Sequence, residues 1–547
     1  MKYVFILFLS FVLTSFLLPN LIKFLVIKKL VDNPGPRKIH ASAVPRLGGV
    51  SIVFSMLFVM SIFVPEYVKA MPLLISAMIL FFTGMIDDLL DINWKIKLLS
   101  QLISVLISLK FILDLTPAIY LFGIQLPLVI GSPLLILFMI GTINSINLMD
   151  GLDGLVSGFC ILVFFVLSIL GFLFQSQIIT FLTIAIIGSL LSFLKYNSNP
   201  ARIFLGDNGS LFLGYSLVIS SFYISILRYG HLDLGFPILL LFLPIIDTLK
   251  VMFVRIRQGK NPFLPDKNHL HHIIFGKNIR HKIVVALIHL FSVGYIFMAV
   301  IYLKYNDGYL IIPVLLLSFI LINMQYILNH VTLSGERRAL IKKIISNKMK
   351  YIISIDKILI ALSSLPLLGL IISIFSLEHY HDSNFPWIQI IVIMFLEFAI
   401  IAYHFWSSKK LDNIYILINS ILFFSFATDE YYFQNIFHSI SLLSISFVLL
   451  LIIVTFSIFI HCNNINDKIS FFSGYDLIVI ILFALLMSMQ TVLPSTFLAN
   501  MLGVGVVSIT TYYWFRLIQN IFVEKSSFIP FLSYTLPVLH LLMKMNY

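Results

Sequence analysis

Long apolar runs alternate with short polar connectors along the first 328 residues. A membrane-spanning helix needs about 20 predominantly apolar residues, and a transmembrane barrel needs a strict apolar–polar alternation that the run Ile179–Leu194 lacks. The pattern predicts an all-α, polytopic integral membrane helical bundle with about 11 spans in this part. The runs cover approximately 3–26, 48–64, 72–86, 98–113, 128–146, 156–174, 179–194, 209–227, 236–254, 283–303 and 309–328.

The organisation changes after Leu328, where a basic stretch precedes further apolar runs that give about seven more C-terminal spans. We therefore predict a motif-bearing membrane domain at 1–330, a basic cytoplasmic linker at 331–350, and an additional C-terminal transmembrane region of unknown function at 351–547. Polar residues are scattered through that last region, and partner docking, assembly or lipid handling are the expected roles. Glu397 is an intramembrane acid there, either functional or a helix-packing residue with a satisfied partner.

Composition supports a membrane protein. Hydrophobic residues make up 60% of the chain and charged residues 11%, which excludes a soluble enzyme, a disordered chain and a small secreted scaffold. Cys160 and Cys462 lie far apart in apolar surroundings, so neither a disulfide framework nor a cysteine metal site is expected. The first run has its strongest positive flank after it and is expected to be a retained span, not a signal peptide.

The net charge of +12 is distributed in a membrane-specific way. Cations gather in every second connector, and the connectors between them hold almost none. The positive-inside rule places the cationic connectors in the cytoplasm and the N-terminus outside. The basic balance is therefore no sign of nucleic-acid binding.

Each cytoplasmic connector of the first part carries a polar cluster, whereas the outer connectors carry none. Ionisable groups at span ends that face one compartment are functional by default. Five such clusters predict one active site on the cytoplasmic face. The clusters cover Asn33–Gly49, Gly84–Gln101, Asn144–Gly154, Asn199–Gly214 and Pro244–His272.

Carboxylates in three clusters suggest a divalent cation. The adjacent Asp87 and Asp88 repel each other unless a cation such as Mg²⁺ or a basic side chain lies near. Asp207, in Gly-Asp-Asn-Gly-Ser at an expected helix start, suits Mg²⁺-phosphate binding. Asn147 and Asp150 can share a helical face, with Asp153 in the next turn. Helix capping is the alternative for the aspartate pair and for the third cluster, and an ordinary Gly-Asp turn is the alternative at Asp207.

Cationic groups complete the set. His269, His271 and His272 could be read as a zinc site, but no acid or cysteine stands at useful spacing. With Arg255 and its neighbours they resemble a phosphate cradle instead, or else a solvated loop. The first connector adds Lys38, His40 and Arg46, which taken alone are ordinary inner-face cations attracted to anionic lipid.

Together, these groups predict a phosphoryl-type transfer between a lipid substrate and a soluble anionic one. No Walker loop or glycine-rich dinucleotide turn suggests ATP or NAD. A polytopic transporter of lipid-linked glycans is the rival class, but it should carry ionisable groups near the bilayer midplane. The first eleven runs are nearly free of such groups.

The five clusters, in this order, resemble the polyprenyl-phosphate N-acetylhexosamine-1-phosphate transferases over about residues 1–328. The resemblance implies a Mg²⁺-dependent reaction, with Mn²⁺ as a substitute, at a cytoplasmic site in the bacterial inner membrane. N-acetylhexosamine 1-phosphate would pass from a UDP-sugar to undecaprenyl phosphate, releasing UMP and starting a lipid-linked glycan of the O-antigen, common-antigen or teichoic-acid type. The His-x-His-His form is similar to the GlcNAc-type enzymes; the muramoyl-pentapeptide branch, with three consecutive histidines, is the alternative.

The resemblance also implies residue roles and partners. Expected partners are UDP-N-acetylhexosamine, undecaprenyl phosphate and membrane lipids, with a homodimer or membrane proteins of the glycan pathway in addition and no nucleic acid. Residues 1–330 would form the sugar-1-phosphate transferase domain. The expected catalytic residues are Asp87, Asp88, Asp150 and Asp153; the expected metal ligands are Asp207 and Asn147; the expected substrate-binding residues are Lys38, His40, Arg46, Lys97, His269, His271 and His272, with Arg255 from the phosphate cradle.

The ionisation of the acceptor narrows the mechanism. A phosphate monoester has a second pKa near ~6, so the lipid phosphate is largely dianionic at neutral pH and needs no strong base. Fixed cations and metal must offset its repulsion from the pyrophosphate. We favour direct attack, with one aspartate orienting the lipid phosphate. A two-step route through an aspartyl-phosphate intermediate stays open.

Overall fold

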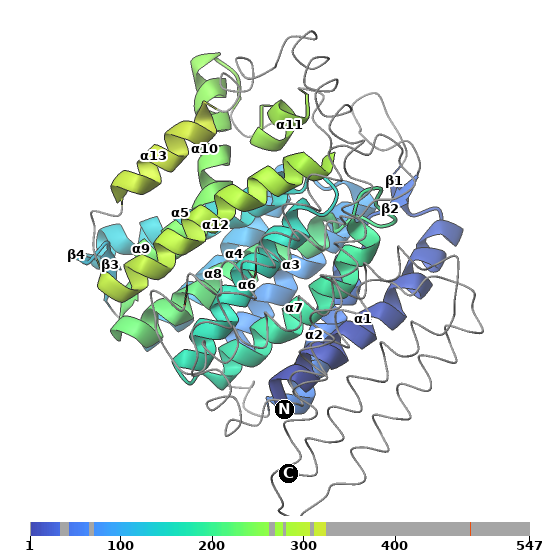
Figure 1. Ribbon diagram of the computed structural model, residues 1–547, viewed down its shortest axis with the longest axis horizontal. Coiled ribbons are helices and arrows are strands. Elements are labelled where there is room, and N and C mark those ends of the chain that lie inside the picture. Colours follow the sequence, from blue (N-terminus) through green and yellow to red (C-terminus); the bar gives the residue numbers. More distant parts are fainter. Residues whose placement is uncertain are drawn as a thin grey trace, which may run out of the picture. The chain divides into compact units, whose positions relative to one another are not determined.

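The computed structural model describes residues 2–32, 43–64, 71–116, 118–261, 268–276, 281–306 and 311–323, with Leu482 and Met489. All of these residues belong to one compact unit. Figure 1 shows their helices lying side by side as a bundle. The linker predicted at 331–350 lies outside the described residues, and so does the C-terminal region with Glu397, apart from Leu482 and Met489.

The described part is built almost entirely of helices. They are α1 (Lys2–Ile27), α2 (Gly49–Phe63), α3 (Met71–Leu90), α4 (Trp94–Leu115), α5 (Leu128–Met149), α6 (Leu155–Leu173), α7 (Gln177–Asn197), α8 (Gly206–Tyr229), α9 (Gly235–Leu240), α10 (Phe242–Arg257), α11 (Leu270–Phe275), α12 (His281–Tyr305) and α13 (Ile311–Ile322). In this part, eight helices are long and apolar enough to cross a membrane: α1, α3 to α8, and α12. The predicted all-α polytopic membrane fold is confirmed.

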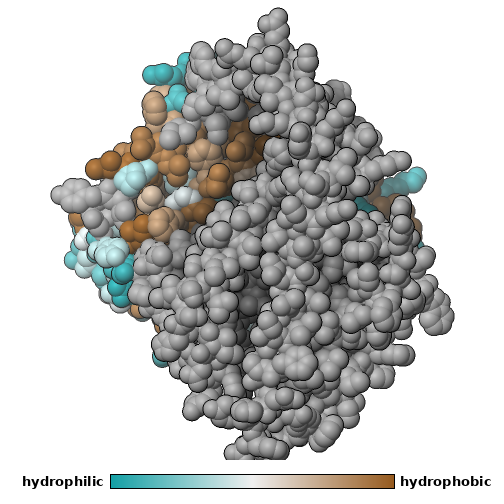
Figure 2. All heavy atoms as spheres, in the orientation of Figure 1, coloured by the Kyte–Doolittle hydropathy of each residue, from teal (hydrophilic) through white to brown (hydrophobic). Residues whose placement is uncertain are grey.

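The centre of the bundle is formed by α6, α7 and α8. In its most apolar stretch, α6 has 89% of its residues buried and α8 has 83%, against 28% for α1. No charged residue occurs in α6, and a helix that is hydrophobic all round is typically enclosed by others. The helices around the centre expose apolar side chains instead. On the face shown in Figure 2, hydrophobic atoms gather at the upper left, where Figure 1 places α13. Ile312, Leu316 and Phe319 of α13 are exposed.

The apolar run at 236–254 differs from the single span that its length predicts. It is divided into α9 and α10, with Leu241 in a non-helical conformation at the break. Pro244 lies three residues further on and has no backbone N–H to donate to the carbonyl of Leu240. Its ring also crowds that carbonyl, and the helix breaks one turn before the proline. The shorter α10 carries both polar and apolar residues and leads toward the histidine cluster.

Two small sheets, which the apolar pattern does not predict, tie connectors together. β1 (Val31–Asp32) pairs with β2 (Val44–Pro45) in an antiparallel ribbon. β3 (Ile119–Leu121) forms a hairpin with β4 (Ile124–Leu126) and pairs in parallel with β5 (Leu232–Asp233), in the order β4-β3-β5. The hairpin turns at Phe122 and Gly123, whose φ angles of 50° and 79° match a type I′ turn. Glycine suits the second position because it has no Cβ.

Polar bridges between helices fix the elements that carry the site. The Tyr215 hydroxyl of α8 donates to the carbonyl of Leu73 in α3 at 3.1 Å and lies 2.7 Å from the Ser108 hydroxyl of α4. Gln101 of α4 and Asn144 of α5 exchange two hydrogen bonds of 3.1 and 2.7 Å. These bridges link α3, α4, α5 and α8, the four helices whose ends carry the site.

Candidate active site

Polar side chains from α3, α4, α5 and α8 come together at one end of these helices. They lie in the last turns of α3 and α5 and in the first turns of α4 and α8, within three of the five clusters that the sequence analysis defines. A helix end leaves backbone groups without partners, so polar side chains are needed there. The residues brought together by hydrogen bonds are Asp87, Asp88, Lys97, Asn147 and Asp207.

Asp88 joins the end of α3 to the beginning of α8. Its carboxylate accepts hydrogen bonds from the backbone N–H groups of Asp207 and Asn208, both at 3.0 Å, and from the Asn208 side chain at 2.6 Å. A carboxylate at a helix N-terminus satisfies free N–H groups and complements the positive end of the helix dipole. Gly84 permits the approach, because a Cβ at that position would lie 2.3 Å from the Asp207 carbonyl oxygen.

Lys97 is the cation at the centre of the cluster. Its Nζ lies 2.9 Å from Asp87 Oδ2 and also contacts Asp207 Oδ2. The second oxygen of Asp87 accepts a hydrogen bond from the backbone N–H of Ile92 at 3.0 Å, in the turn between α3 and α4. Lys97 therefore offsets the charge of two carboxylates that come from different helices.

Asn147 supplies a third oxygen to the same place. With its amide oxygen facing Lys97, that oxygen lies 3.2 Å from Lys97 Nζ, and the amide nitrogen donates to Asp207 Oδ1 at 3.2 Å and to Ser210 Oγ at 2.6 Å. Three side-chain oxygens, from Asp87, Asn147 and Asp207, therefore surround one positive charge.

This donor set fits Mg²⁺, which takes oxygen ligands and usually binds one or two carboxylates together with substrate phosphates. The Lys97 ammonium marks the point where the three oxygens converge. Among the described residues, no group of three or more His, Cys, Asp or Glu side chains is arranged as a metal site. A metal ion here would therefore depend on further oxygens from its substrates.

The loop between α5 and α6 holds the other two predicted acids, which have different surroundings. Burial, together with the charges of Asp88 and Asp153, raises the pKa of Asp150 to about 7. Its carboxylate has no hydrogen-bond donor among the described residues. Asp153 accepts hydrogen bonds from the Asn199 side chain at 2.8 Å and the Ala201 backbone at 3.1 Å. Asp150 is therefore available to a substrate, whereas Asp153 holds the connector before α8.

The histidine cluster is held by Asp247 of α10. His269 Nδ1 lies 2.9 Å from Asp247 Oδ2, and the backbone N–H of Leu270 donates to Asp247 Oδ1 at 2.8 Å. Both side chains are buried. Because the carboxylate accepts from Nδ1, the other ring nitrogen of His269, Nε2, is left as the acceptor in the neutral ring.

His271 connects this cluster to the loop between α5 and α6. Its ring stacks on that of His269, with centroids 5.8 Å apart, and its buried Nε2 has no hydrogen-bond partner among the described residues. A Cβ on Gly151 would lie 2.2 Å from this nitrogen, so only glycine fits there. Burial and the two neighbouring histidines lower the pKa of His271 well below its usual range, and the ring is neutral at pH 7.

The remaining cationic residues are less closely associated with the carboxylates. Arg46 pairs with Asp32 at 2.6 Å, and its carbonyl oxygen lies against Gly206 at the start of α8. Arg255 is buried and donates its Nε to the carbonyl of Asn261 at 2.7 Å. No hydrogen bond in the described part joins Arg255 to the carboxylate cluster. Lys38 and His40 lie outside the described residues.

Some residues that organise the site were not predicted from the sequence. Asp247 is one of them, although it lies within the fifth cluster. Asn197, at the end of α7, accepts hydrogen bonds from the Gly154 backbone and the Ser157 hydroxyl, both at 3.0 Å, and donates to the carbonyl of Ile203 at 3.0 Å. A single buried Asn at the end of an apolar run is a usable signal, because buried polar side chains need partners.

The fold and the site define a class: a polytopic membrane protein whose carboxylates and cations converge at helix ends, suited to phosphate chemistry on a lipid. A model of glycosyl transferase family 4 matches residues 70–225, a range that begins just before α3 and includes most of α8. The chain belongs to this family.

Similar proteins support the assignment over most of their own length. One is a "Probable undecaprenyl-phosphate N-acetylglucosaminyl 1-phosphate transferase" of Bacillus subtilis (strain 168), 32% identical over 330 residues, or 59% of this chain and 91% of the relative. An undecaprenyl-phosphate alpha-N-acetylglucosaminyl 1-phosphate transferase of Thermotoga maritima is 32% identical over 48% of this chain and 78% of its own. The protein of the same name in Escherichia coli (strain K12) is 28% identical over 47% of this chain and 72% of the relative.

Proposed function

We propose that this chain transfers N-acetylglucosamine 1-phosphate from UDP-N-acetylglucosamine to undecaprenyl phosphate. An oxygen of the lipid phosphate attacks the phosphorus next to the sugar, the bond from that phosphorus to the bridging oxygen breaks, and UMP leaves with that oxygen. The observation that carries the proposal is the convergence of Asp87, Lys97, Asn147 and Asp207, from four helix ends, on a single point. The names of the similar proteins agree with it.

We propose Mg²⁺ as the cofactor, held by Asp207, Asn147 and Asp87, with Mn²⁺ as a substitute. When bound, the ion would offset the negative charge of the pyrophosphate as the bridging bond breaks. Lys97, which contacts both carboxylates, would then be free to turn toward the incoming phosphates. An ammonium on a flexible stem suits such a movement.

The chain's own groups position the substrates. Asp88 fixes the N-terminus of α8, whose positive dipole end faces the site and stabilises phosphate charge nearby. The Asp150 carboxylate has no hydrogen-bond donor among the described residues and can accept a hydrogen bond from a sugar hydroxyl. The neutral His271 and the buried His269 lie beside the same loop and would contact the diphosphate.

The hydrogen bonds of the aspartate pair support direct attack. Asp88 already accepts three hydrogen bonds and Asp87 is paired with Lys97. A carboxylate whose lone pairs are engaged by several donors is a weak nucleophile, which disfavours an aspartyl-phosphate intermediate. Positioning and electrostatics then provide the rate acceleration, as in other phosphoryl transfers.

The test is transfer by the purified chain in detergent. Radiolabelled UDP-N-acetylglucosamine, UDP-N-acetylgalactosamine and UDP-N-acetylmuramoyl-pentapeptide would each be incubated with undecaprenyl phosphate and Mg²⁺. We expect label in the lipid phase with the first donor and release of UMP in equal amount. Preferential use of the muramoyl donor would assign the chain to the peptidoglycan branch. No transfer with any donor would refute the proposal.

We propose the bacterial inner membrane as the location, with the site on the cytoplasmic side and the N-terminus outside. The support is the charge of the connectors: Lys28, Lys29 and Arg46 flank one end of the first two spans, and the connector between α6 and α7 is uncharged. In cells, a cysteine placed at Gln175 should react with a membrane-impermeant maleimide, and one placed at Asn93 should not. The reverse labelling would invert the proposed orientation.

A further inference from the structure

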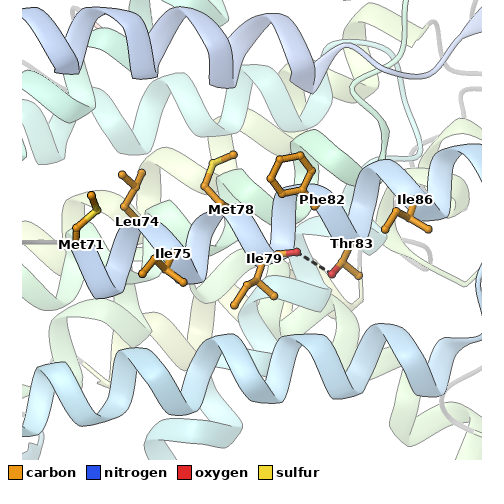
Figure 3. Close-up of a pocket in the computed structure, with 8 residues that line it drawn as sticks. All are labelled: Met71, Leu74, Ile75, Met78, Ile79, Phe82, Thr83 and Ile86. Atoms are coloured by element: carbon orange, nitrogen blue, oxygen red, sulfur yellow. Dashed lines mark hydrogen bonds between the residues drawn. The ribbon is translucent and has the colours of Figure 1, made fainter.

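A groove along α3 and a smaller cavity near the histidine cluster differ in what lines them. The groove is lined by α3 alone, and its one hydroxyl, on Thr83, bonds to the carbonyl of Ile79 within the helix (Figure 3). The smaller cavity, of about 10 Å³, is lined by five helices instead. Its lining includes Met149 of α5, Leu155 of α6, Asp247 of α10, His271 of α11 and Ile288 of α12. This cavity therefore marks a junction between the histidine cluster and the loop that joins α5 to α6.

The loop 150–154 begins and ends at this cavity. Met149 lies directly before the loop and Leu155 directly after it, and both residues line the cavity. The loop carries Asp150, whose carboxylate has no hydrogen-bond donor among the described residues. No bond of its own side chain holds this carboxylate in the described part, so its position depends on the backbone of the loop and on the contacts that fix the loop.

Three elements fix the loop from outside. Asn197 of α7 accepts a hydrogen bond from the Gly154 N–H at 3.0 Å, and His271 of α11 lies against Gly151. The third contact comes from α12, where His289 Nε2 lies 3.1 Å from the carbonyl oxygen of Leu155. A carbonyl oxygen can only accept a hydrogen bond, so Nε2 carries the proton of the ring and donates it.

This hydrogen bond is what His289 supplies at its place in the fold. The side chain is 1% exposed, in a helix that is long and apolar enough to cross a membrane. With the proton on Nε2, Nδ1 is an acceptor, and it is buried without a hydrogen-bond partner among the described residues. A buried nitrogen without a partner lowers stability, and a leucine would fill the place without that cost. A leucine could not, however, make the bond to Leu155.

On the basis of the proposed function, we propose that His289 is a positioning residue for the transfer reaction. Its bond to Leu155 holds the loop 150–154 against the histidine cluster and thereby sets where Asp150 accepts a hydrogen bond from the donor sugar. Because His289 is buried, it acts through the loop and not by contact with a substrate. Its removal should therefore affect use of the UDP-sugar and leave use of the lipid acceptor unchanged.

His289→Leu removes the donor and keeps the place filled. We expect this variant to melt in detergent at a temperature similar to that of wild type, because the Nδ1 that lacks a partner is lost together with the bond. The KM for UDP-N-acetylglucosamine should nevertheless rise about ten-fold, the effect of weakening one hydrogen bond to a carboxylate. The KM for undecaprenyl phosphate should not change. A partly unfolded preparation would lower kcat alone, so a general loss of fold does not produce this result.

Two further variants provide rescue and control. His289→Gln places an amide nitrogen near the position of the histidine Nε2, and its donor KM should be close to that of wild type. Ser292→Ala is the matched control on α12, because Ser292 is also buried but donates to the carbonyl of Ile288 in its own helix at 2.9 Å. It should leave both KM values unchanged. A wild-type donor KM in His289→Leu, or a glutamine variant no better than the leucine variant, would overturn the inference.

A double-mutant cycle tests the path through Asp150. If His289 acts by placing that carboxylate, His289→Leu should have little further effect on the donor KM in a chain that already carries Asp150→Asn. The same rise in both backgrounds would show that His289 acts elsewhere and would overturn the inference, while the proposed function would stand. Transfer from no donor by the wild-type chain would instead refute the proposed function itself.

Discussion

At the scale of single residues, Lys97 holds together a group of oxygens that would otherwise repel. Asp87 and Asp207 come from different helices, and both contact its ammonium. Asn147 places a third oxygen at 3.2 Å from the same nitrogen. A small divalent cation at this point would replace one positive charge by two, which suits a reaction that brings two phosphate groups together.

Asp207→Asn should therefore lose turnover by at least about 100-fold, because a ligand carboxylate worth several kcal/mol of transition-state stabilisation is removed. The steady-state rate of the purified variant with Mg²⁺ is the measurement, and its elution as a single detergent-solubilised species shows that it folds. Asp91→Asn is the control: Asp91 is exposed in the turn after α3, and its variant should keep full activity. Near-wild-type turnover by Asp207→Asn would remove Asp207 from the metal site.

Asp150 should make stability depend on pH. Its pKa is about 7 in the folded chain, above the ordinary value of 3.8, so the folded state holds this proton more tightly than the unfolded state does. The corresponding stabilisation is complete below pH 3.8 and is lost as pH rises through 7. Asp150→Asn should therefore melt at a higher temperature than wild type at pH 8, and the difference should be smaller at pH 5. Thermal unfolding in detergent at the two pH values measures this difference.

The same substitution should have the opposite effect on activity. If the ionised carboxylate contacts substrate, kcat/KM of the wild type rises between pH 6 and 8, and Asp150→Asn is slow at every pH. The variant should retain only the pH dependence of the lipid phosphate, whose second pKa is near ~6. A wild-type pH profile in the variant would assign Asp150 a structural role.

The candidate residues could be predicted from the sequence because they gather at one side of successive apolar runs. Spacing alone cannot show which partner each residue chooses. Asp153 was grouped with Asp150, yet its carboxylate binds the turn at Asn199 and Ala201. Asp247 was not singled out, because its partner His269 lies 22 residues further along the chain and meets it only after α10 and α11 fold together.

At the scale of elements, the hydrogen bonds of Asp247 join α10 to the start of the short helix α11. Asp247 accepts from both His269 and the Leu270 backbone, so it sets the ring orientation and the start of the short helix at once. The sequence predicts a continuous span over 236–254. The break before Pro244 instead ends α9 and starts a separate helix, α10, which carries Asp247 beside the histidines.

Asp247→Asn should mainly weaken use of the nucleotide sugar. An amide can still accept from Leu270, but its NH₂ group faces His269 Nδ1 and would force the other tautomer. We expect the KM for UDP-N-acetylglucosamine to rise about ten-fold, the cost of a hydrogen bond to a displaced histidine, with kcat changed less. Gln258, an exposed residue directly after α10, offers the control site: Gln258→Asn should leave both constants unchanged. A fall in kcat alone would contradict the positioning role of Asp247.

The short strands could not be predicted from the apolar pattern of the sequence. β3, β4 and β5 have two or three residues each, too few for an alternating pattern to emerge. They are fixed by contacts across the chain instead: Asp233 accepts hydrogen bonds from the backbone of Gly123 at 2.8 Å and the hydroxyl of Tyr302 at 3.0 Å.

At the scale of the whole molecule, the first part of the chain contains every described site residue. The Bacillus subtilis relative is matched over 91% of its length by 59% of this chain. The division at 330, predicted from the end of the motif-bearing runs, stays a prediction. It separates the clusters from a region in which the sequence shows only scattered polar residues.

A chain truncated after Lys350 should therefore keep sugar-phosphate transfer. The reason is that α3, α4, α5 and α8, which hold the carboxylate cluster, all precede Tyr305. The assay is transfer in detergent by a truncated chain that elutes as one monodisperse species, compared with the full chain at equal concentration. A well-folded but inactive truncation would mean that the C-terminal region completes the site.

The distribution of charge along the central helices has a consequence for the product. No charged residue occurs in α5 or α6, Lys195 in the last turn is the one charge of α7, and α8 has charges only near its ends, at Asp207 and Arg228. Between their ends, these four helices therefore offer no charged side chain that could bind a diphosphate headgroup on its way from one leaflet to the other. We therefore expect the lipid-linked sugar to leave these four helices into the leaflet where it was made.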